Sequence, residues 1–349
     1  MRFYNQQHRF YAGGDLHARS LFLHILDDQG QTRFEKNLPA GPDAFLEAVA
    51  PFRDGLVVGV ECMFAWYWLA DLCEAQGIPF VLGHALYMKA IHGGKSKNDR
   101  IDAGKIAKLL RGGTFPQAYV YPQGLRETRD LLRRRTFLVR QRAQFLTHIQ
   151  NTISQYNLPP LNKKLSYAAN RQEAKWLDLF PHESVKKSLR TDLDLIDTLD
   201  EQINDLELYL TRNAKIDDPN TYRILRSVPG IGKVLSLIML YEIHDIRRFP
   251  EVGNFVSYAR LVRCAHESAG KVKGYGGRKI GNGHLKWAFS EAACLLLRAC
   301  PQAKKWLERK EKKVGKATAL GILSAKLGRT VYHLWRKQEA FDAKRFLTS

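Results

Sequence analysis

Two aspartates, Asp99 and Asp102, lie three residues apart inside a basic stretch, Lys95–Leu110. Apolar residues at helical spacing predict that both begin a helix, where side chains three positions apart share a face. Carboxylates this close repel each other unless a proton or a cation relieves them, so the pair suits a divalent cation shared with a phosphate. The alternative is an ordinary acidic helix N-terminus, because exposed backbone N–H groups favour Asp there. Four basic residues around the pair are predicted to contact nucleic acid: Lys95, Lys97, Arg100 and Lys105.

Two further carboxylates follow predicted strands. A short strand over residues 9–14 ends at Asp15, and the apolar run 55–60, typical of a buried central strand, ends at Glu61. The alternative to a ligand role for Asp15 is that of an ordinary turn residue. Glu61 comes directly after an apolar strand, where an unpaired carboxylate is costly, so we expect it to have a ligand or a partner.

The elements that must position these acids alternate in a recognisable order. Three meandering strands precede a strand–helix–strand unit and the acidic helix, and this order resembles the ribonuclease H-like fold in its RuvC-like, Holliday-junction-resolvase variety. Sites in such open sheets gather at the carboxyl ends of strands. The resemblance implies a two-metal phosphoryl-transfer site built by the four acids, with Mg²⁺ as the expected ion. The predicted elements are strands 9–14, 19–26 and 31–38, a helix over 42–52, strand 55–60, a helix over 65–76 and strand 78–82.

The overall charge points to a polyanion as partner. The 349 residues carry a formal net charge of +20, which favours binding to DNA or RNA. A membrane surface is the rival partner, but no apolar run is long enough to span a bilayer and no signal region opens the chain. The five cysteines form no C-x-x-C pair, which argues against a zinc site and fits a reducing compartment. We therefore expect a cytoplasmic protein that associates with the nucleoid when it acts.

The middle of the chain is predicted to be helical. A basic helix begins near Gln123. Its arginines are predicted either to contact phosphates or to form a solvent-exposed face of the helix. An acidic helix follows over 189–210, with apolar residues at alternating spacings of three and four, which is typical of a coiled-coil seam: Ile196, Leu199, Ile203, Leu206 and Leu210. This seam predicts either a hairpin with the basic helix or an association of two copies.

The last third begins near Pro219 with a stretch that resembles a helix-hairpin-helix element, Arg226–Leu235. Gly230 and Gly232 allow close approach of the backbone to a phosphate, and Lys233 opens a helix whose N–H groups point at the anion. An ordinary turn between helices is the alternative. The tail from Pro301 holds thirteen Lys and Arg with interleaved Trp306, Tyr332 and Trp335, which predicts either nucleic-acid contact or a helical core.

A second region that carries chemistry spans residues 254–299. An S-Y-A-R-L element, Ser257–Leu261, precedes Ser268, and a glycine-rich basic loop follows over 272–283 before a helix that starts at His284. Four basic residues there are predicted to balance the charge of a phosphate: Lys271, Lys273, Arg278 and Lys279. A serine needs activation by a base or a metal to act as a nucleophile, and no Ser-His-Asp triad is evident in the sequence. A loop serine that solvates its own backbone is the alternative for Ser268.

The four acids and this second region together resemble the DEDD transposases of insertion sequences, which are bridge-RNA-guided serine recombinases. The resemblance runs nearly the whole length and places Ser268 at the position of the family's nucleophile, with Ser257 and Ser290 as competitors. Two residues depart from the family pattern. Ala269 follows the serine where the family often has glycine, and Arg260 replaces the usual glycine of the S-Y-A-G-L element.

The resemblance implies an enzyme that cuts and rejoins donor and target DNA. It implies two Mg²⁺ ions, a structured bridge RNA that chooses the sites, a covalent phosphoserine intermediate and a homo-oligomer, dimer or tetramer. The rival hypotheses are a junction-resolving nuclease that uses the acids and water, and an inactive nucleic-acid-binding scaffold. The expected fold is α/β plus all-α: a RuvC-like catalytic domain over 1–122, a helical coiled-coil region over 123–218 and a mainly helical transposase domain over 219–349.

Overall fold

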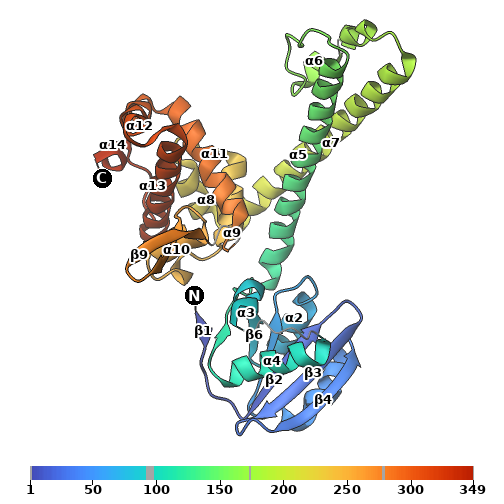
Figure 1. The fold of residues 1–349 in the computed structure, drawn as a ribbon, viewed down its shortest axis with the longest axis vertical. Coiled ribbons are helices and arrows are strands. Elements are labelled where there is room, and N and C mark those ends of the chain that lie inside the picture. The colour runs from blue at the N-terminus through green and yellow to red at the C-terminus, as the bar shows by residue number, and fades with distance from the viewer. Residues whose placement is uncertain (1, 92–97, 173, 277–279, 349) are drawn as a thin grey trace. The chain divides into compact units, whose positions relative to one another are not determined.

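The computed structural model describes residues 2–91, 98–172, 174–276 and 280–348. It divides into two compact units, Met1–Gln123 and Gly124–Ser349 (Figure 1). Unit 1 is mixed α/β, and unit 2 is helical apart from one β-hairpin. A separate domain boundary at residue 218 stays a prediction, as does the ribonuclease H-like assignment of unit 1.

Unit 1 is built on a five-stranded sheet of order β4-β3-β2-β5-β6, in which β2, β5 and β6 are parallel and β3 and β4 antiparallel. The predicted meander and strand–helix–strand order are therefore correct. The elements are β1 Phe3–Tyr4, β2 Phe10–Leu16, β3 Ser20–Asp27, β4 Thr32–Pro39, α1 Pro42–Val49, the 3₁₀ turn Ala50–Phe52, β5 Leu56–Glu61, α2 Tyr67–Ala75, β6 Phe80–Gly83, α3 Ala85–Ile91, α4 Asp99–Arg111 and β7 Phe115–Pro116.

Both faces of this sheet are covered, because the central strands are apolar throughout. Val58 and Val60 of β5 pack with α1 and α2 in one core. Val57 and Tyr11 point to the other face, where they pack with Leu109 and its neighbours on α4. The alternation along β5 thus assigns α4, the acidic helix, to the face opposite α1 and α2.

Two glycines bring α4 onto the sheet. Gly13 of β2 and Gly59 of β5 are register partners, so they lie side by side on neighbouring strands. A Cβ atom at Gly13 would lie 2.2 Å from the carbonyl oxygen of Ala103 and 2.4 Å from the backbone nitrogen of Ala107, both on α4. A Cβ atom at Gly59 would lie 2.6 Å from Cδ1 of Leu110. We call this pair the glycine platform, because the backbone of α4 rests directly on the sheet backbone at Gly13, and the Leu110 side chain of α4 fills the space above Gly59.

Unit 2 opens with two long helices, α5 Gln123–Gln155 and α7 Glu183–Asp217 (Figure 1). Side-chain contacts join them in antiparallel order: Arg135 forms an ion pair with Glu207, Arg142 forms one with Asp200, and His148 hydrogen-bonds to Asp192. Beyond these pairs, Ile149 and Ile153 of α5 share a small core with α7 and with the segment between the helices. That segment contains α6 Ala168–Gln172 and the 3₁₀ turn Ala174–Leu179. The acidic helix therefore forms an intramolecular hairpin with the basic helix, the first of the two arrangements that the sequence predicted.

The remainder of unit 2 surrounds α9, whose nine residues from Leu235 to Ile243 are all buried. Tyr332 and Trp335 belong to this core, so helical packing accounts for these two aromatics. Within the described ranges, no helix is long and apolar enough to cross a bilayer. The elements are α8 Pro219–Arg226, α9 Lys233–Ile243, the 3₁₀ turn Ile246–Arg248, α10 Val252–Tyr258, β8 Cys264–Ser268, β9 Lys271–Gly276, α11 Gly283–Ala299, α12 Pro301–Val314, α13 Lys316–Lys337 and α14 Ala343–Thr348.

Candidate active site

The first two acids meet where β2 ends and α4 begins. Asp15 lies two residues after Gly13 and so points to the face that carries α4. Asp99 is the first residue of α4, and the Asn98 side chain fixes this start by accepting a hydrogen bond from the backbone N–H of Ile101 at 2.8 Å. The glycine platform therefore sets the approach of Asp99 to Asp15.

His17 completes a group of three with these acids. Its Nε2 atom lies 3.6 Å from Oδ2 of Asp15 and 3.6 Å from Oδ1 of Asp99. One potential ligand atom from each of the three residues lies within 4.8 Å of the others. Sequence reasoning missed His17. The available signal was its spacing, because a residue two positions after Asp15 returns to the same face at the end of a strand.

The other two acids are near in the fold but are not members of this group. Glu61 ends β5 directly after Val60, the register partner of Gly14, so it occupies the strand beside Asp15 at the same edge. Asp102 lies in the first turn of α4, where it accepts a hydrogen bond from Nζ of Lys105 at 3.2 Å. The convergence of all four acids on one metal site stays a prediction.

The basic frame of the acidic helix has partners of its own. Arg100 makes a bidentate contact with Glu35, at 2.9 Å from Nε and 2.8 Å from a terminal nitrogen, and these hydrogen bonds lower the pKa of Glu35. Lys105 contacts Asp102. Lys95 and Lys97 lie outside the described residues. Nucleic-acid contact by this frame stays a prediction, and for Arg100 it requires sharing or release of Glu35.

The Asp15, His17 and Asp99 group fits a divalent cation. Two carboxylates supply the hard oxygen ligands that Mg²⁺ and Mn²⁺ prefer, and an imidazole adds a ligand suited to transition metals. Asp99 and His17 are exposed and Asp15 is half-buried, so the group is accessible to a substrate that brings further oxygens.

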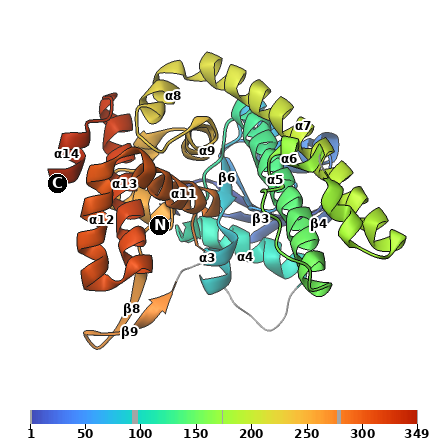
Figure 2. The ribbon, with the colours of Figure 1, turned by 90° about the horizontal axis from the view of Figure 1, so that it is seen from above.

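Ser268 is the last residue of β8 in a hairpin, and it pairs with Lys271 of β9. Figure 2 shows this hairpin extending beyond the helices of its unit. The turn is Ala269-Gly270, and both residues have positive φ, 51° and 72°, the combination that a two-residue type I′ hairpin turn requires. The prediction of a loop from residue 272 is wrong for its first part, because Lys271–Gly276 is a strand. Ser268, Lys271 and Lys273 are exposed, whereas Arg278 and Lys279 lie outside the described residues.

The competing serines have ordinary environments. The hydroxyl of Ser290 donates to the carbonyl oxygen of Lys286 one turn earlier in α11, at 2.8 Å. Ser257 is exposed on α10. The Ser268 hairpin differs from both, because it presents a hydroxyl at an exposed turn beside two lysines.

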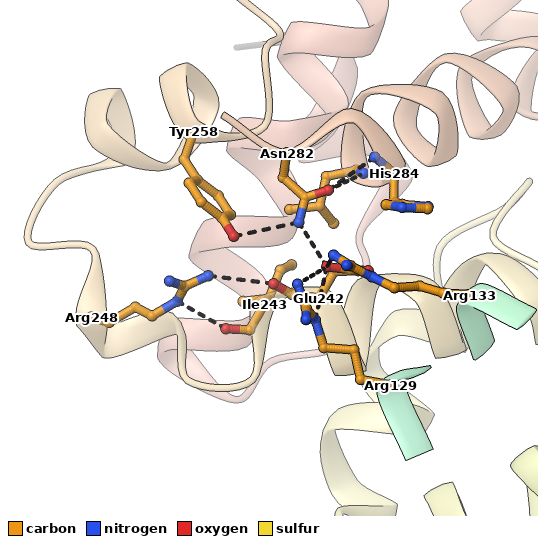
Figure 3. A network of polar contacts seen from close by, with 9 residues as sticks. Arg129, Arg133, Glu242, Ile243, Arg248, Tyr258, Asn282 and His284 are labelled. Atoms are coloured by element: carbon orange, nitrogen blue, oxygen red, sulfur yellow. Dashed lines mark hydrogen bonds and ion pairs between the residues drawn. The ribbon is translucent and has the colours of Figure 1, made fainter. Parts of the chain in front are cut away.

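A buried network supports the end of the glycine-rich element (Figure 3). The carboxylate of Glu242 on α9 accepts hydrogen bonds from Arg129 at 3.0 Å, from Arg133 at 2.7 Å and from Asn282 at 2.8 Å. Burial alone would raise the pKa of Glu242, but hydrogen bonds and charges from these partners outweigh it and lower the pKa to about 2. Asn282 also caps α11, accepting from the backbone N–H groups of His284 and Leu285. Two arginines of α5, Arg129 and Arg133, therefore help to hold Asn282 in place through Glu242.

Arg260 has the backbone conformation that favours glycine. Its φ is 55°, in the left-handed region, and its Nε donates to the carbonyl oxygen of Ile280 at 3.0 Å. Gly281, with φ of 95°, leaves no room for a side chain, because a Cβ atom would lie 2.5 Å from the carbonyl oxygen of Tyr258. The Ser257–Leu261 element thus contacts the end of the glycine-rich element, because Arg260 bonds to Ile280 and Tyr258 bonds to Asn282.

The helix-hairpin-helix stretch forms two helices and a turn, as predicted. Gly230 has φ of 89°, and a Cβ atom there would lie 2.5 Å from the backbone nitrogen of Leu296. Close packing on α11 therefore accounts for Gly230. Gly232 has open space around it and precedes the exposed Lys233 at the start of α9. Phosphate binding by Gly230, Gly232 and Lys233 stays a prediction.

Comparison with known proteins identifies the family. Residues 12–158 match the model of the DEDD transposases of IS110-type elements, and residues 222–308 match the transposase IS116/IS110/IS902 family. This chain belongs to the IS110-type transposase family. A transposase for insertion sequence element IS1111A from Coxiella burnetii is 25% identical over 328 residues, covering 90% of this chain and 86% of that protein.

Shorter matches come from actinobacterial insertion elements. An uncharacterized protein of element IS116 from Streptomyces clavuligerus is 26% identical over 113 residues, 32% of this chain and 28% of the relative. An uncharacterized protein of element IS110 from Streptomyces coelicolor is 27% identical over 97 residues, 28% of this chain and 24% of the relative. The family implies a divalent metal, and the donor set at Asp15, His17 and Asp99 fits one.

Proposed function

We propose that this transposase cuts and rejoins DNA through a covalent phosphoserine formed by Ser268, with Asp15, Glu61, Asp99 and Asp102 as its acidic metal site. The observation that carries the proposal is the juxtaposition of Asp15 and Asp99 at the carboxyl end of β2, where open α/β sheets place their sites. A bound Mg²⁺ pair would supply Lewis-acid stabilisation of the charge that develops on the phosphate oxygens.

The covalent step conserves the energy of the phosphodiester bond in a phosphoserine linkage. Oγ of Ser268 forms a bond to phosphorus, the bond from phosphorus to one DNA oxygen breaks, and the serine proton is transferred to that leaving oxygen. A free DNA hydroxyl from another strand then attacks the phosphoserine and reverses these changes. Lys271 and Lys273, exposed beside Ser268, offset the phosphate charge. The family resemblance supports a bridge RNA as guide and an oligomer in which Ser268 of one copy serves the acids of another.

The distribution of charge supports a polyanionic partner for the C-terminal part. Residues 219–349 hold 26 Lys and Arg against nine Asp and Glu, which is +17 of the formal +20. Such an excess attracts phosphate backbones and makes binding depend on salt. Donor and target DNA and the RNA are therefore expected to bind mainly through this part of the chain.

Trapping of the intermediate tests the proposal. Wild type, Ser268→Ala and Ser290→Ala are incubated with Mg²⁺, guide RNA and DNA that spans an end of the element, then denatured and separated by size. Wild type and Ser290→Ala should each give a protein–DNA adduct, and Ser268→Ala should give none. Ser290→Ala is the matched control, because its hydroxyl is satisfied within α11. Cleavage and rejoining by Ser268→Ala would favour the nuclease alternative, in which metal-bound water attacks.

A further inference from the structure

Met63 and Phe64 form an exposed apolar tip that begins two residues after Glu61. Their exposed fractions are 48% and 76%, and they lie in the loop between β5 and α2. A single exposed apolar residue is common in soluble proteins. Two adjacent ones within three residues of a candidate active-site acid are a different case, because their position brings them close to any bound substrate.

The fold holds this tip outward. The loop begins with a hydrogen bond from the backbone N–H of Cys62 to the carbonyl oxygen of Gly83, at 2.9 Å. It ends at Trp66, which is buried and packs edge-on against Tyr67 with ring centroids 4.6 Å apart. Both ends of the loop are therefore fixed on unit 1, and the exposure of Phe64 follows from the path of the backbone.

The tip shares an edge of the sheet with the acids. The register pair Gly14 and Val60 places the end of β5 beside the end of β2, where Asp15 lies. The pair Glu61 and Gly83 places the end of β6 on the other side. The helix after β6, α3, carries Lys89, an exposed cation in no ion pair with the described residues. Along this edge the strand ends follow in the order β2 with Asp15, β5 with Glu61 and the apolar tip, then β6.

We infer that Phe64, with Met63 beside it, stacks on a nucleobase next to the phosphate bound at the acids and partly opens that base step. The inference rests on the proposed function, because it requires DNA at this edge. A phosphate at Asp15 and Asp99 has its flanking nucleotides within reach of the neighbouring strand ends. Aromatic rings bind unstacked bases of any sequence, and apolar side chains of this kind wedge between base steps. A divalent cation at the acids would thus hold the phosphate while the tip binds the adjoining base.

A double-mutant cycle tests this contact. Binding of full-length wild type and Phe64→Ala to a duplex that spans an element end is measured with Ca²⁺ in place of Mg²⁺, because Ca²⁺ also binds carboxylate oxygens, and the same samples are checked for uncut DNA. The same duplex is then prepared with an abasic site at each position flanking the cleavage point in turn. Phe64→Ala should weaken binding of the intact duplex by about 5- to 30-fold. At one abasic position the effect of Phe64→Ala should fall to about twofold or less, because its partner is missing.

Tyr167→Ala is the control, since Tyr167 is an exposed aromatic of unit 2 with an exposed fraction of 64%. Its effect on binding should be the same for every duplex. Phe64→Leu should retain part of the coupling, because it keeps the apolar wedge. An equal effect of Phe64→Ala on all duplexes overturns the inference, as does a loss of oligomer, which would place the tip between protein copies. Cleavage by wild type in Mg²⁺ is measured separately, so failure of the proposed function is seen in that assay and not in the binding cycle.

Discussion

Replacing Glu242 by glutamine removes the one negative charge at the centre of the buried network in unit 2. Glutamine keeps the size of the side chain and still offers a carbonyl oxygen to Asn282. Arg129 and Arg133, however, lose the carboxylate to which both donate. Glu242 is 1% exposed and the Arg129 side chain 11%, so water has little access to the charge of Arg129, whereas Arg133, at 37%, is partly solvated.

The expected cost follows from two independent estimates. A pKa of about 2 instead of 4.5 means that the folded surroundings favour the charged carboxylate by about 3 kcal/mol. Removal of one partner from a buried ion pair costs about 3–5 kcal/mol. For a unit of this size each kcal/mol lowers Tm by roughly 2–4 °C, so a cost of about 3 kcal/mol for Glu242→Gln should lower the Tm of unit 2 by roughly 6–12 °C, and a cost of about 5 kcal/mol by up to roughly 20 °C.

Scanning calorimetry of the full chain measures this shift. Glu183→Gln is the control, because Glu183 forms an exposed pair with Lys186 and such pairs contribute about 0–1 kcal/mol. A triple variant, Arg129→Met, Arg133→Met and Glu242→Leu, leaves no orphaned charge and should recover most of the loss. A Tm shift for Glu242→Gln no larger than that for Glu183→Gln would refute this role of the buried charge, as would a triple variant less stable than the single one.

Three further predictions concern packing, pH and salt. Gly13→Ala should destabilise unit 1 by about 1–3 kcal/mol through its clash with the backbone of α4, whereas Gly41→Ala, with nothing within 4 Å of its Cβ, should change the unfolding midpoint little. The folded pKa of Glu242 is depressed, so its contribution is complete above pH 4.5 and is lost as pH falls towards 2. Urea midpoints between pH 5 and pH 3 should therefore fall more for wild type than for Glu242→Gln. Lys233→Ala should weaken DNA binding modestly and flatten its salt dependence by about one unit, and a slope equal to that of wild type would exclude a phosphate contact.

Hydrophobic patterns predicted most of unit 1, because strands buried on both faces leave long apolar runs. The run before Glu61 and the alternation around Asp15 located two acids at strand ends, and helical spacing located Asp99 at a helix start. The two long helices could be predicted equally well, since the apolar residues of α7 repeat at helical spacing on the side that faces α5.

Contacts between distant residues left no local signal. Glu242 is a single acid in an apolar helix, and its partners Arg129 and Arg133 lie more than a hundred residues earlier. The hairpin at Ser268 was missed because Ala-Gly is a weaker turn signal than Asn-Gly. Its Ala269 takes a positive φ that only the paired strands around it explain.

The glycine platform has a consequence for how this family can diverge. Where Gly13 meets α4, backbone touches backbone, so at this point no side chain separates the strand that bears Asp15 from the helix that bears Asp99. Ile106 and Leu109 pack in the core beside this contact, and exchange of either for a residue of similar size would leave the contact at Gly13 in place. Core residues can therefore change while the two acids stay close together. The position least open to replacement is Gly13, which bears no side chain.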